Sequence, residues 1–147
     1  FEVALAGDVL IASENARFAD THGRMGIMPG WGLSQMLPRI IGPLRAREMS
    51  FSGNFIDAQT ALAWGLVNHV TPPAELLPRA VRLAQDIAEN DRPFIKRLKT
   101  LIDDGLKATL AEGLAMERAL NVEWNARQSP EEIEKRRLAV TARGRKQ

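Results

Sequence analysis

The stretch that decides how this chain is interpreted runs from Phe18 to Gly42 and reads FADTHGRMGIMPGWGLSQMLPRIIG. It begins as the end of a strand, continues through a loop with four glycines, and ends in a helix. The helix is predicted because apolar residues recur every three or four positions. These residues are Leu33, Met36, Leu37, Ile40 and Ile41. Glycine permits positive φ and close approach of another group, and the apolar loop residues are expected to pack beneath something. A buried connection and a functional loop both stay open.

Composition excludes several classes of protein. The 147 residues fit a single domain, and 45% hydrophobic with 26% charged residues is typical of a soluble globular chain. No apolar run reaches the ~18 residues of a membrane-spanning helix. Without cysteine there is neither a disulfide framework nor a thiolate metal site, and two histidines do not favour a histidine-based metal centre. We therefore expect no metal and no membrane segment.

The chain opens at Phe1 without a methionine and enters an apolar run, FEVALAG, directly. A signal peptide would show a basic segment before the apolar run and small residues at a cleavage site, and neither is present. We interpret the chain as the C-terminal part of a longer protein.

Short strands and loops are predicted first and helices afterwards. The expected elements are a buried helical turn at 2–6, strands at 8–13, 17–19 and 66–70, and helices at 33–41, 44–51, 58–64, 76–88, 93–105, 106–125 and from 130 onward. Pro38 should kink or shorten its helix. Asp57 is expected to cap the helix that follows it, and Gly65 to end that helix in the left-handed conformation.

Three segments in this order resemble one family. They are FEVALAGDVLIASENARFAD, GIMPGWGLSQMLPRIIG and FSGNFIDAQTALAWGLVNHVTP. Together they are similar to the C-terminal half of the crotonase superfamily, which contains enoyl-CoA hydratases and isomerases. The resemblance is specific from Phe1 to Leu77 and looser in the helices beyond.

The resemblance implies an α/β fold: the second half of a spiral core of ββα units, at residues 1–73, followed by a helical region for oligomerisation, at residues 74–147. It also implies acyl-CoA thioester substrates, a homotrimer or a dimer of trimers, a role in fatty acid metabolism and a cytoplasmic location. No metal or redox cofactor is implied, because coenzyme A enters as part of the substrate.

The shared chemistry of the family is stabilisation of a thioester enolate by two backbone N–H groups, each worth ~3 kcal/mol. The resemblance places one donor upstream of this chain and the other in a glycine-rich turn that would end just before Phe1. On that interpretation the chain alone lacks the oxyanion hole and most of the coenzyme A pocket.

Two positions match the catalytic carboxylates of the hydratases. Glu2 falls at the first glutamate, which activates water, and a structural role beside a helix terminus stays open. His22 falls where the second glutamate would stand. Imidazole could donate a proton to the α-carbon, hold the water, or serve only as a hydrogen-bonding group. Asp20 could orient the His22 ring if the strand continues that far.

The loop supplies the candidate substrate-binding residues, which are Met25, Gly26, Ile27, Pro29, Gly30 and Trp31. Gly30 stands where dienoyl-CoA isomerases carry an aspartate, so that acid is missing. Trp31 replaces a residue that is usually small, and it could either cap the acyl pocket or fill a gap in the core. His69 is interpreted as structural.

The basic residues cluster at the C-terminal end, where residues 131–147 hold six Lys or Arg and three Glu. A solvated basic face is favoured over contacts with coenzyme A phosphates. No aromatic residues are interleaved, so no nucleic-acid partner is expected. Three functions remain open: enoyl-CoA hydration, another crotonase reaction such as double-bond isomerisation, and non-catalytic acyl-CoA binding.

Overall fold

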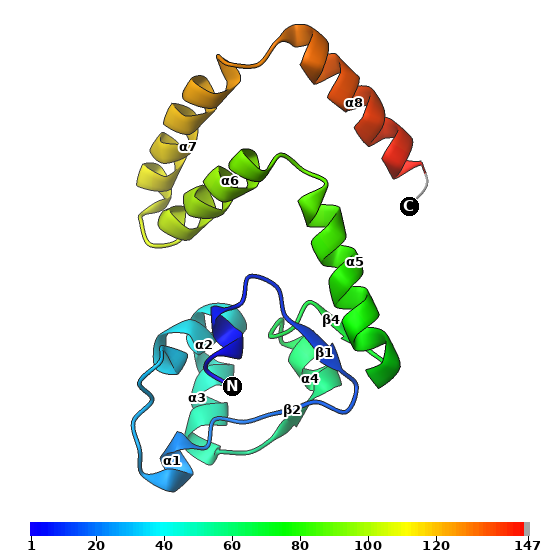
Figure 1. Ribbon diagram of the computed structural model, residues 1–147. Helices are drawn as coiled ribbons and strands as arrows, with labels where there is room; N and C mark the ends of the chain where they lie inside the picture. The colour runs from blue at the N-terminus through cyan, green and yellow to red at the C-terminus, as the bar shows by residue number, and fades with distance from the viewer. Residues whose placement is uncertain (146–147) are drawn as a thin grey trace. The chain divides into compact units, whose positions relative to one another are not determined.

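The computed structural model describes residues 1–145 (Figure 1). The helices and strands in chain order are η1 (Ala4–Ala6), β1 (Ile11–Ser13), β2 (Arg17–Phe18), α1 (His22–Met25), α2 (Leu33–Ile41), α3 (Pro43–Ser52), β3 (Ile56–Asp57), α4 (Ala58–Ala63), β4 (His69–Thr71), η2 (Pro73–Glu75), α5 (Leu76–Ala88), α6 (Arg92–Gly105), α7 (Leu110–Asn125) and α8 (Pro130–Gly144). Lys146, which belongs to the predicted basic tail, lies outside the described residues.

The chain divides into two compact units, of which the first is Phe1–Ile87 and the second begins at Ala88. The first unit contains all the described strands and the helices up to α5. The predicted division separated a crotonase core at 1–73 from an oligomerisation region at 74–147. It stays a prediction. By its contacts, nearly all of α5 belongs with the first unit.

Two small sheets organise the first unit. β1 and β4 are parallel with Ile11 opposite His69, and β2 and β3 are antiparallel with Phe18 opposite Ile56. Two strands begin later than predicted. The apolar run at 8–13 is extended only from Ile11, and the strand predicted at 66–70 is found at His69–Thr71. In the second run, Leu66 and Val67 are buried but lie in a loop before the strand, and burial alone does not distinguish a strand from a packed loop.

Helix α2 carries the core of this unit. Its residues Leu33, Leu37 and Ile41 are at most 4% exposed, as the predicted periodicity requires. Met36, which was predicted on the same face, is instead exposed. The helix continues to Ile41 despite Pro38. The same core includes buried residues of α3 and α4 and the loop residues Leu66 and Val67, and its full membership is Leu5, Ala12, Leu33, Leu37, Ile41, Ala46, Met49, Ala58, Ala61, Leu66 and Val67.

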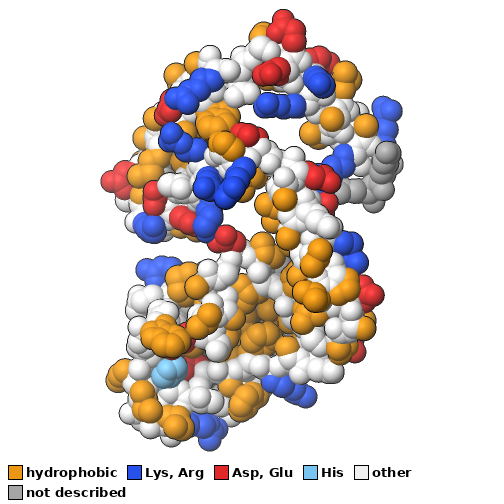
Figure 2. Space-filling view, in the orientation of Figure 1, with side chains coloured by type: hydrophobic (Ala, Val, Ile, Leu, Met, Phe, Trp, Pro, Cys, Tyr) orange, Lys and Arg blue, Asp and Glu red, His pale blue; other side chains and the backbone are white. Residues whose placement is uncertain are grey.

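The loop between α1 and α2 does not pack as predicted. Met28 is 89% exposed and Trp31 is 75% exposed, and Met25 and Ile27 are also exposed. Figure 2 shows orange hydrophobic side chains at the surface of this unit. Two glycines set the ends of this loop, since Gly26 ends α1 at φ 67° and Gly32 begins α2 at φ 99°. The expectation failed because local apolar content cannot specify a packing partner.

Helix α1 was not predicted, and its position depends on a close approach to α3. A Cβ at Gly23 would lie 2.9 Å from the backbone oxygen of Ser50, closer than real Cβ atoms come. The Arg24 side chain continues the contact by donating to Asn54 Oδ1 at 3.1 Å. Only glycine at position 23 therefore allows the chain that follows β2 to lie against α3.

The second unit is built from capped helices. Asp91, Thr109 and Ser129 each accept a backbone N–H bond at the start of α6, α7 and α8, respectively. Thr109 and Glu112 form a reciprocal capping box, which explains why α7 begins at Leu110 and not at the predicted residue 106. Within this unit α6 and α7 pack together, with the rings of Phe94 and Trp124 5.7 Å apart.

Replacing Gly23 with alanine should displace α1 from α3. We expect Gly23→Ala to lower the free energy of unfolding by about 1–3 kcal/mol, because the added methyl group must push against a backbone oxygen. Chemical denaturation followed by circular dichroism measures this change. Gly30→Ala is the matched control, since nothing lies within 4 Å of a Cβ there. Equal stability of the two variants would contradict the close-approach argument.

Candidate active site

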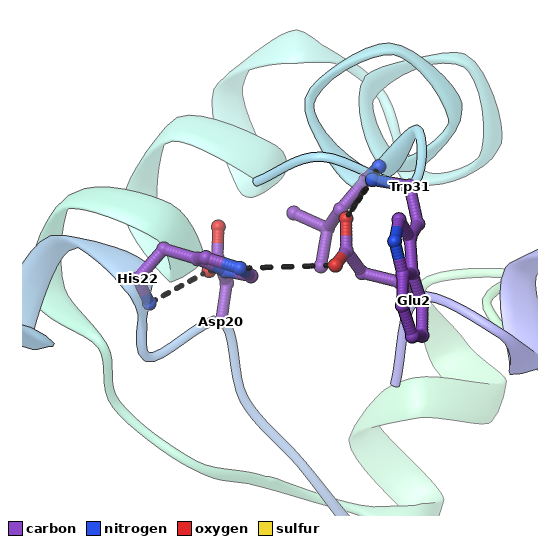
Figure 3. Close-up of polar contacts among 5 residues, drawn as sticks. Glu2, Asp20, His22 and Trp31 are labelled. Atoms are coloured by element: carbon purple, nitrogen blue, oxygen red, sulfur yellow. Dashed lines mark hydrogen bonds and ion pairs between the residues drawn. The ribbon is translucent and has the colours of Figure 1, made fainter. Parts of the chain in front are cut away.

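A pocket of about 210 Å³ lies in the first unit, where the N-terminal turn meets the segment after β2 and the start of α2. Its lining residues are Phe1, Glu2, Val3, Ala19, Thr21, His22, Trp31 and Leu33. Both predicted catalytic residues line it, although they are separated by twenty positions in the sequence. Figure 3 shows the His22 ring directed at the Glu2 carboxylate, with the Trp31 side chain beside Glu2 and Asp20 next to the imidazole.

The Glu2 carboxylate is held by the start of α2. Its Oε1 atom accepts hydrogen bonds from the backbone N–H of Trp31 at 3.1 Å and of Leu33 at 3.3 Å. Leu33 is the first residue of α2, and its N–H has no partner within the helix because the first turn has no preceding carbonyls, whereas Trp31 lies just before the helix. One carboxylate oxygen is thus fixed by the backbone, and the other, Oε2, faces His22.

The His22 imidazole stands between two carboxylates. Its Nε2 atom lies 3.8 Å from Glu2 Oε2, and its Nδ1 atom lies 2.7 Å from Asp20 Oδ1. The His22 side chain is 27% exposed and the Glu2 side chain 15%, so the pair is partly shielded but still reachable from the pocket. A group that can gain or lose a proton therefore lies beside a carboxylate, which is the arrangement that acid–base chemistry requires.

Asp20 is the deepest charged group of the site, at 3% exposed. Burial by itself raises the pKa of its carboxyl. Hydrogen bonds from Ser50 and from the side chain and backbone of His22 outweigh that effect, so the pKa lies below the ordinary value of 3.8. Asp20 was predicted to orient the His22 ring only if the strand continued to these residues, but β2 ends at Phe18. The contact forms instead through a turn, in which the Asp20 side chain accepts the N–H two residues ahead at 3.1 Å.

The predicted substrate-binding residues are not brought together. Trp31 lines the pocket, whereas Met25 at the end of α1 and the loop residues Gly26, Ile27, Pro29 and Gly30 do not. Their role stays a prediction. The pocket also uses Phe1, Val3, Ala19, Thr21 and Leu33, which no motif in the sequence had marked as functional.

His69 takes no part in this pocket. It lies on β4, and its Nε2 atom is 3.3 Å from a guanidinium nitrogen of Arg79. Among residues 1–145, no group of three or more His, Asp or Glu side chains could hold a metal ion. In the same residues, no helix is long and apolar enough to cross a membrane.

The sequence pattern of the family described as Enoyl-CoA hydratase/isomerase matches residues 1–139. The chain belongs to this family. The membership confirms the resemblance to the crotonase superfamily and the predicted α/β crotonase-like fold. A relative from Arabidopsis thaliana named probable enoyl-CoA hydratase 1, peroxisomal, is 41% identical over 146 residues, which cover 99% of this chain and 55% of the relative.

Solved structures of enoyl-CoA hydratases are similar to this chain in fold. The enoyl-CoA hydratase of Bacillus anthracis is 39% identical with a TM-score of 0.76, over 78% of this chain and 45% of that one. Enoyl-CoA hydratase subunit I of Geobacillus kaustophilus is 32% identical with a TM-score of 0.85, over 94% of this chain and 54% of that one. The chain spans about half the length of the family members it matches.

The buried Asp20 carboxylate should make stability depend on acid pH. Its pKa is lower in the folded state than the ordinary value of 3.8, so its stabilising contribution is fully present above that value. The contribution is lost as the pH falls through the lowered folded-state pKa. We expect the free energy of unfolding to fall less steeply below about pH 4 in Asp20→Asn than in the unsubstituted chain. Denaturant titrations at a series of pH values measure this difference.

Glu14→Gln provides the control for that experiment, since Glu14 is an exposed carboxylate of the same unit. Its substitution should leave the dependence of stability on pH unchanged. If Asp20→Asn shows the same acid dependence as the unsubstituted chain, the hydrogen bonds to Asp20 do not stabilise its ionised form.

Proposed function

We propose that the protein containing this chain is an enoyl-CoA hydratase, which adds water to a trans-2-enoyl-CoA thioester. The observation that carries the proposal is the 3.8 Å approach of His22 Nε2 to Glu2 Oε2 at the wall of one pocket. The enoyl-CoA hydratases among its relatives support the same reaction class. Had the His22 ring turned away from Glu2, a binding protein without catalysis would have been the better interpretation.

In the proposed reaction Glu2 acts as the base. Its Oε2 atom takes a proton from water while the water oxygen bonds to the β-carbon, and the π electrons move toward the thioester oxygen to give an enolate. The enolate then takes a proton at the α-carbon from protonated His22, through Nε2. The product carries a β-hydroxyl group and a new α-hydrogen. Transfer of the proton from Glu2 to Nε2 restores the starting state, and the atoms of one water molecule are accounted for.

The geometry supports a division of labour within Glu2. Oε1 is engaged by two backbone N–H groups, which fix the carboxylate plane, so Oε2 is the oxygen directed at His22. Backbone donors to the enolate oxygen are part of the proposal, and we expect them outside this sequence. Pre-placed groups of this kind need little rearrangement during the reaction.

Trp31 is proposed to contact the acyl chain, because it lines the pocket beside Glu2 and is 75% exposed. The other loop residues predicted for substrate binding, 25–27, 29 and 30, are proposed to contact the thioester only in the complete protein. The acyl-CoA substrate, the homotrimer or dimer of trimers, the role in fatty acid metabolism, the cytoplasmic location and the lack of a further cofactor belong to the same proposal. The Arabidopsis relative, by contrast, is named peroxisomal.

The test is hydration of crotonyl-CoA by the full-length protein, followed by loss of the enoyl thioester absorbance. Glu2→Gln and His22→Gln should each lower kcat by about 10²–10⁴-fold, because each removes one partner of the proton transfers. His69→Gln is the matched control, since His69 lies on β4, contacts Arg79 of α5, does not line the pocket and should be dispensable.

Two outcomes would contradict the proposal. Hydration that survives in His22→Gln would remove His22 from the chemistry and leave Glu2 to act without it. Binding of the thioester without hydration by the unsubstituted protein would reject the hydratase and leave double-bond isomerisation or non-catalytic acyl-CoA binding.

A further inference from the structure

Asp20 does not line the pocket, yet it makes two hydrogen bonds to His22, which does. Its Oδ1 atom accepts from the His22 backbone N–H at 3.1 Å and lies 2.7 Å from His22 Nδ1. The first bond fixes the backbone of His22 at the start of α1. The second fixes the rotation of the ring. Both bonds end on one oxygen of a side chain that is 3% exposed.

The chemistry of this contact decides which imidazole nitrogen carries a proton. An ionised carboxylate can only accept hydrogen bonds, so Nδ1 must donate to it. The lowered pKa of Asp20 is consistent with an ionised carboxylate at this position. In the neutral ring the proton then resides on Nδ1, and the lone pair is on Nε2, which faces Glu2 Oε2.

We propose that Asp20 is a positioning residue that holds His22 in the Nδ1–H form, so that Nε2 alone exchanges protons at the pocket. The catalytic consequence rests on the proposed hydratase function, whereas the tautomer does not. Nε2 loses its proton to the α-carbon and regains one from Glu2, while Nδ1–H stays bonded to Asp20 throughout. Without Asp20, the neutral ring could carry its proton on Nε2. A protonated Nε2 has no lone pair available and could not accept the proton that Glu2 returns.

The surroundings of Asp20 are suited to this role. The Ser50 side chain, from α3, bonds to the Asp20 carboxylate, and the Ser50 backbone oxygen lies close against Gly23. The Asp20 carboxylate is therefore bonded to α3 through Ser50 and to the His22 ring through Oδ1. Among the described residues, the charged groups paired with the imidazole are Glu2 at Nε2 and Asp20 at Nδ1. Within residues 1–145, His22 is the one basic side chain found paired with Asp20.

The direct test is nitrogen-15 NMR of the imidazole rings in the full-length protein without substrate, at a pH where His22 is neutral. This chain has two histidines, and His22→Gln assigns the His22 signals. The unsubstituted protein should show His22 mainly as the Nδ1–H form. Asp20→Ala should shift it toward the Nε2–H form that predominates in free histidine. If the unsubstituted protein shows Nε2–H at His22, the proposal is overturned whether or not any variant folds.

His69 is the internal control, because its Nε2 faces a guanidinium donor of Arg79 and not a carboxylate. Its signals should be the same with and without Asp20. Asp57→Asn is the matched substitution, since Asp57 also accepts a backbone N–H, from Thr60, but touches no imidazole. A shift of the His22 signals in Asp57→Asn as large as that in Asp20→Ala would show a general structural effect and overturn the proposal.

Kinetics test the catalytic consequence separately. In a protein that hydrates crotonyl-CoA, Asp20→Asn should lower kcat by at least about tenfold and leave KM nearly unchanged, because Asp20 does not line the pocket. An unchanged kcat would overturn the catalytic part. A protein that shows the Asp20-dependent Nδ1–H form but hydrates nothing would retain the positioning role and reject the proposed function. The two failures are therefore distinguishable.

Discussion

Leu33 joins the candidate site to the hydrophobic core, and the geometry of both depends on it. Its side chain is 2% exposed and packs with Leu37 and Ile41, while its backbone N–H donates to the Glu2 carboxylate. Burial of a leucine side chain contributes about 1.5–3 kcal/mol, more than a single hydrogen bond. The core therefore fixes where α2 begins, and the start of α2 fixes the carboxylate. An element whose position is set by burial gives the site a rigid reference point that a loop could not.

On the other side of the pocket, a close backbone contact fixes the position of His22. Gly23 lets α1 lie against Ser50 of α3. Asp20 and His22 lie just before Gly23 in the chain. The imidazole thus has a buried carboxylate at one nitrogen and a more exposed one at the other. Two chemically identical groups acquire different roles because one is enclosed and saturated with donors, whereas the other keeps an oxygen directed at the pocket.

The exposed apolar residues of the loop are the clearest departure from expectation. Met28 was expected to pack beneath another part of the molecule but is exposed among the described residues, and Trp31 lines the pocket without filling a gap in the core. Apolar residues indicate that a surface is suited to contact, but the sequence around them does not name the partner. The helix predictions, by contrast, succeeded where local chemistry decides. The helix at 76–88 matches α5, the last helix begins at Pro130 as predicted, Asp57 caps α4, and Gly65 follows α4 with a positive φ. The short strands agree less well, because two or three residues carry no period and pairing depends on a distant segment.

Residue types and their order were enough to establish the family and most of the amphipathic face of α2, and they singled out Glu2 and His22 as candidate catalytic residues, both of which line the pocket. Three features emerged only in the folded chain: His22 turns toward Glu2, Asp20 is buried behind it, and Trp31 lines the pocket from the start of α2. The reason is physical. Short spacings fix local hydrogen bonds and helix faces, whereas contacts between residues twenty or thirty positions apart depend on how closely α1 approaches α3 and where the core places α2.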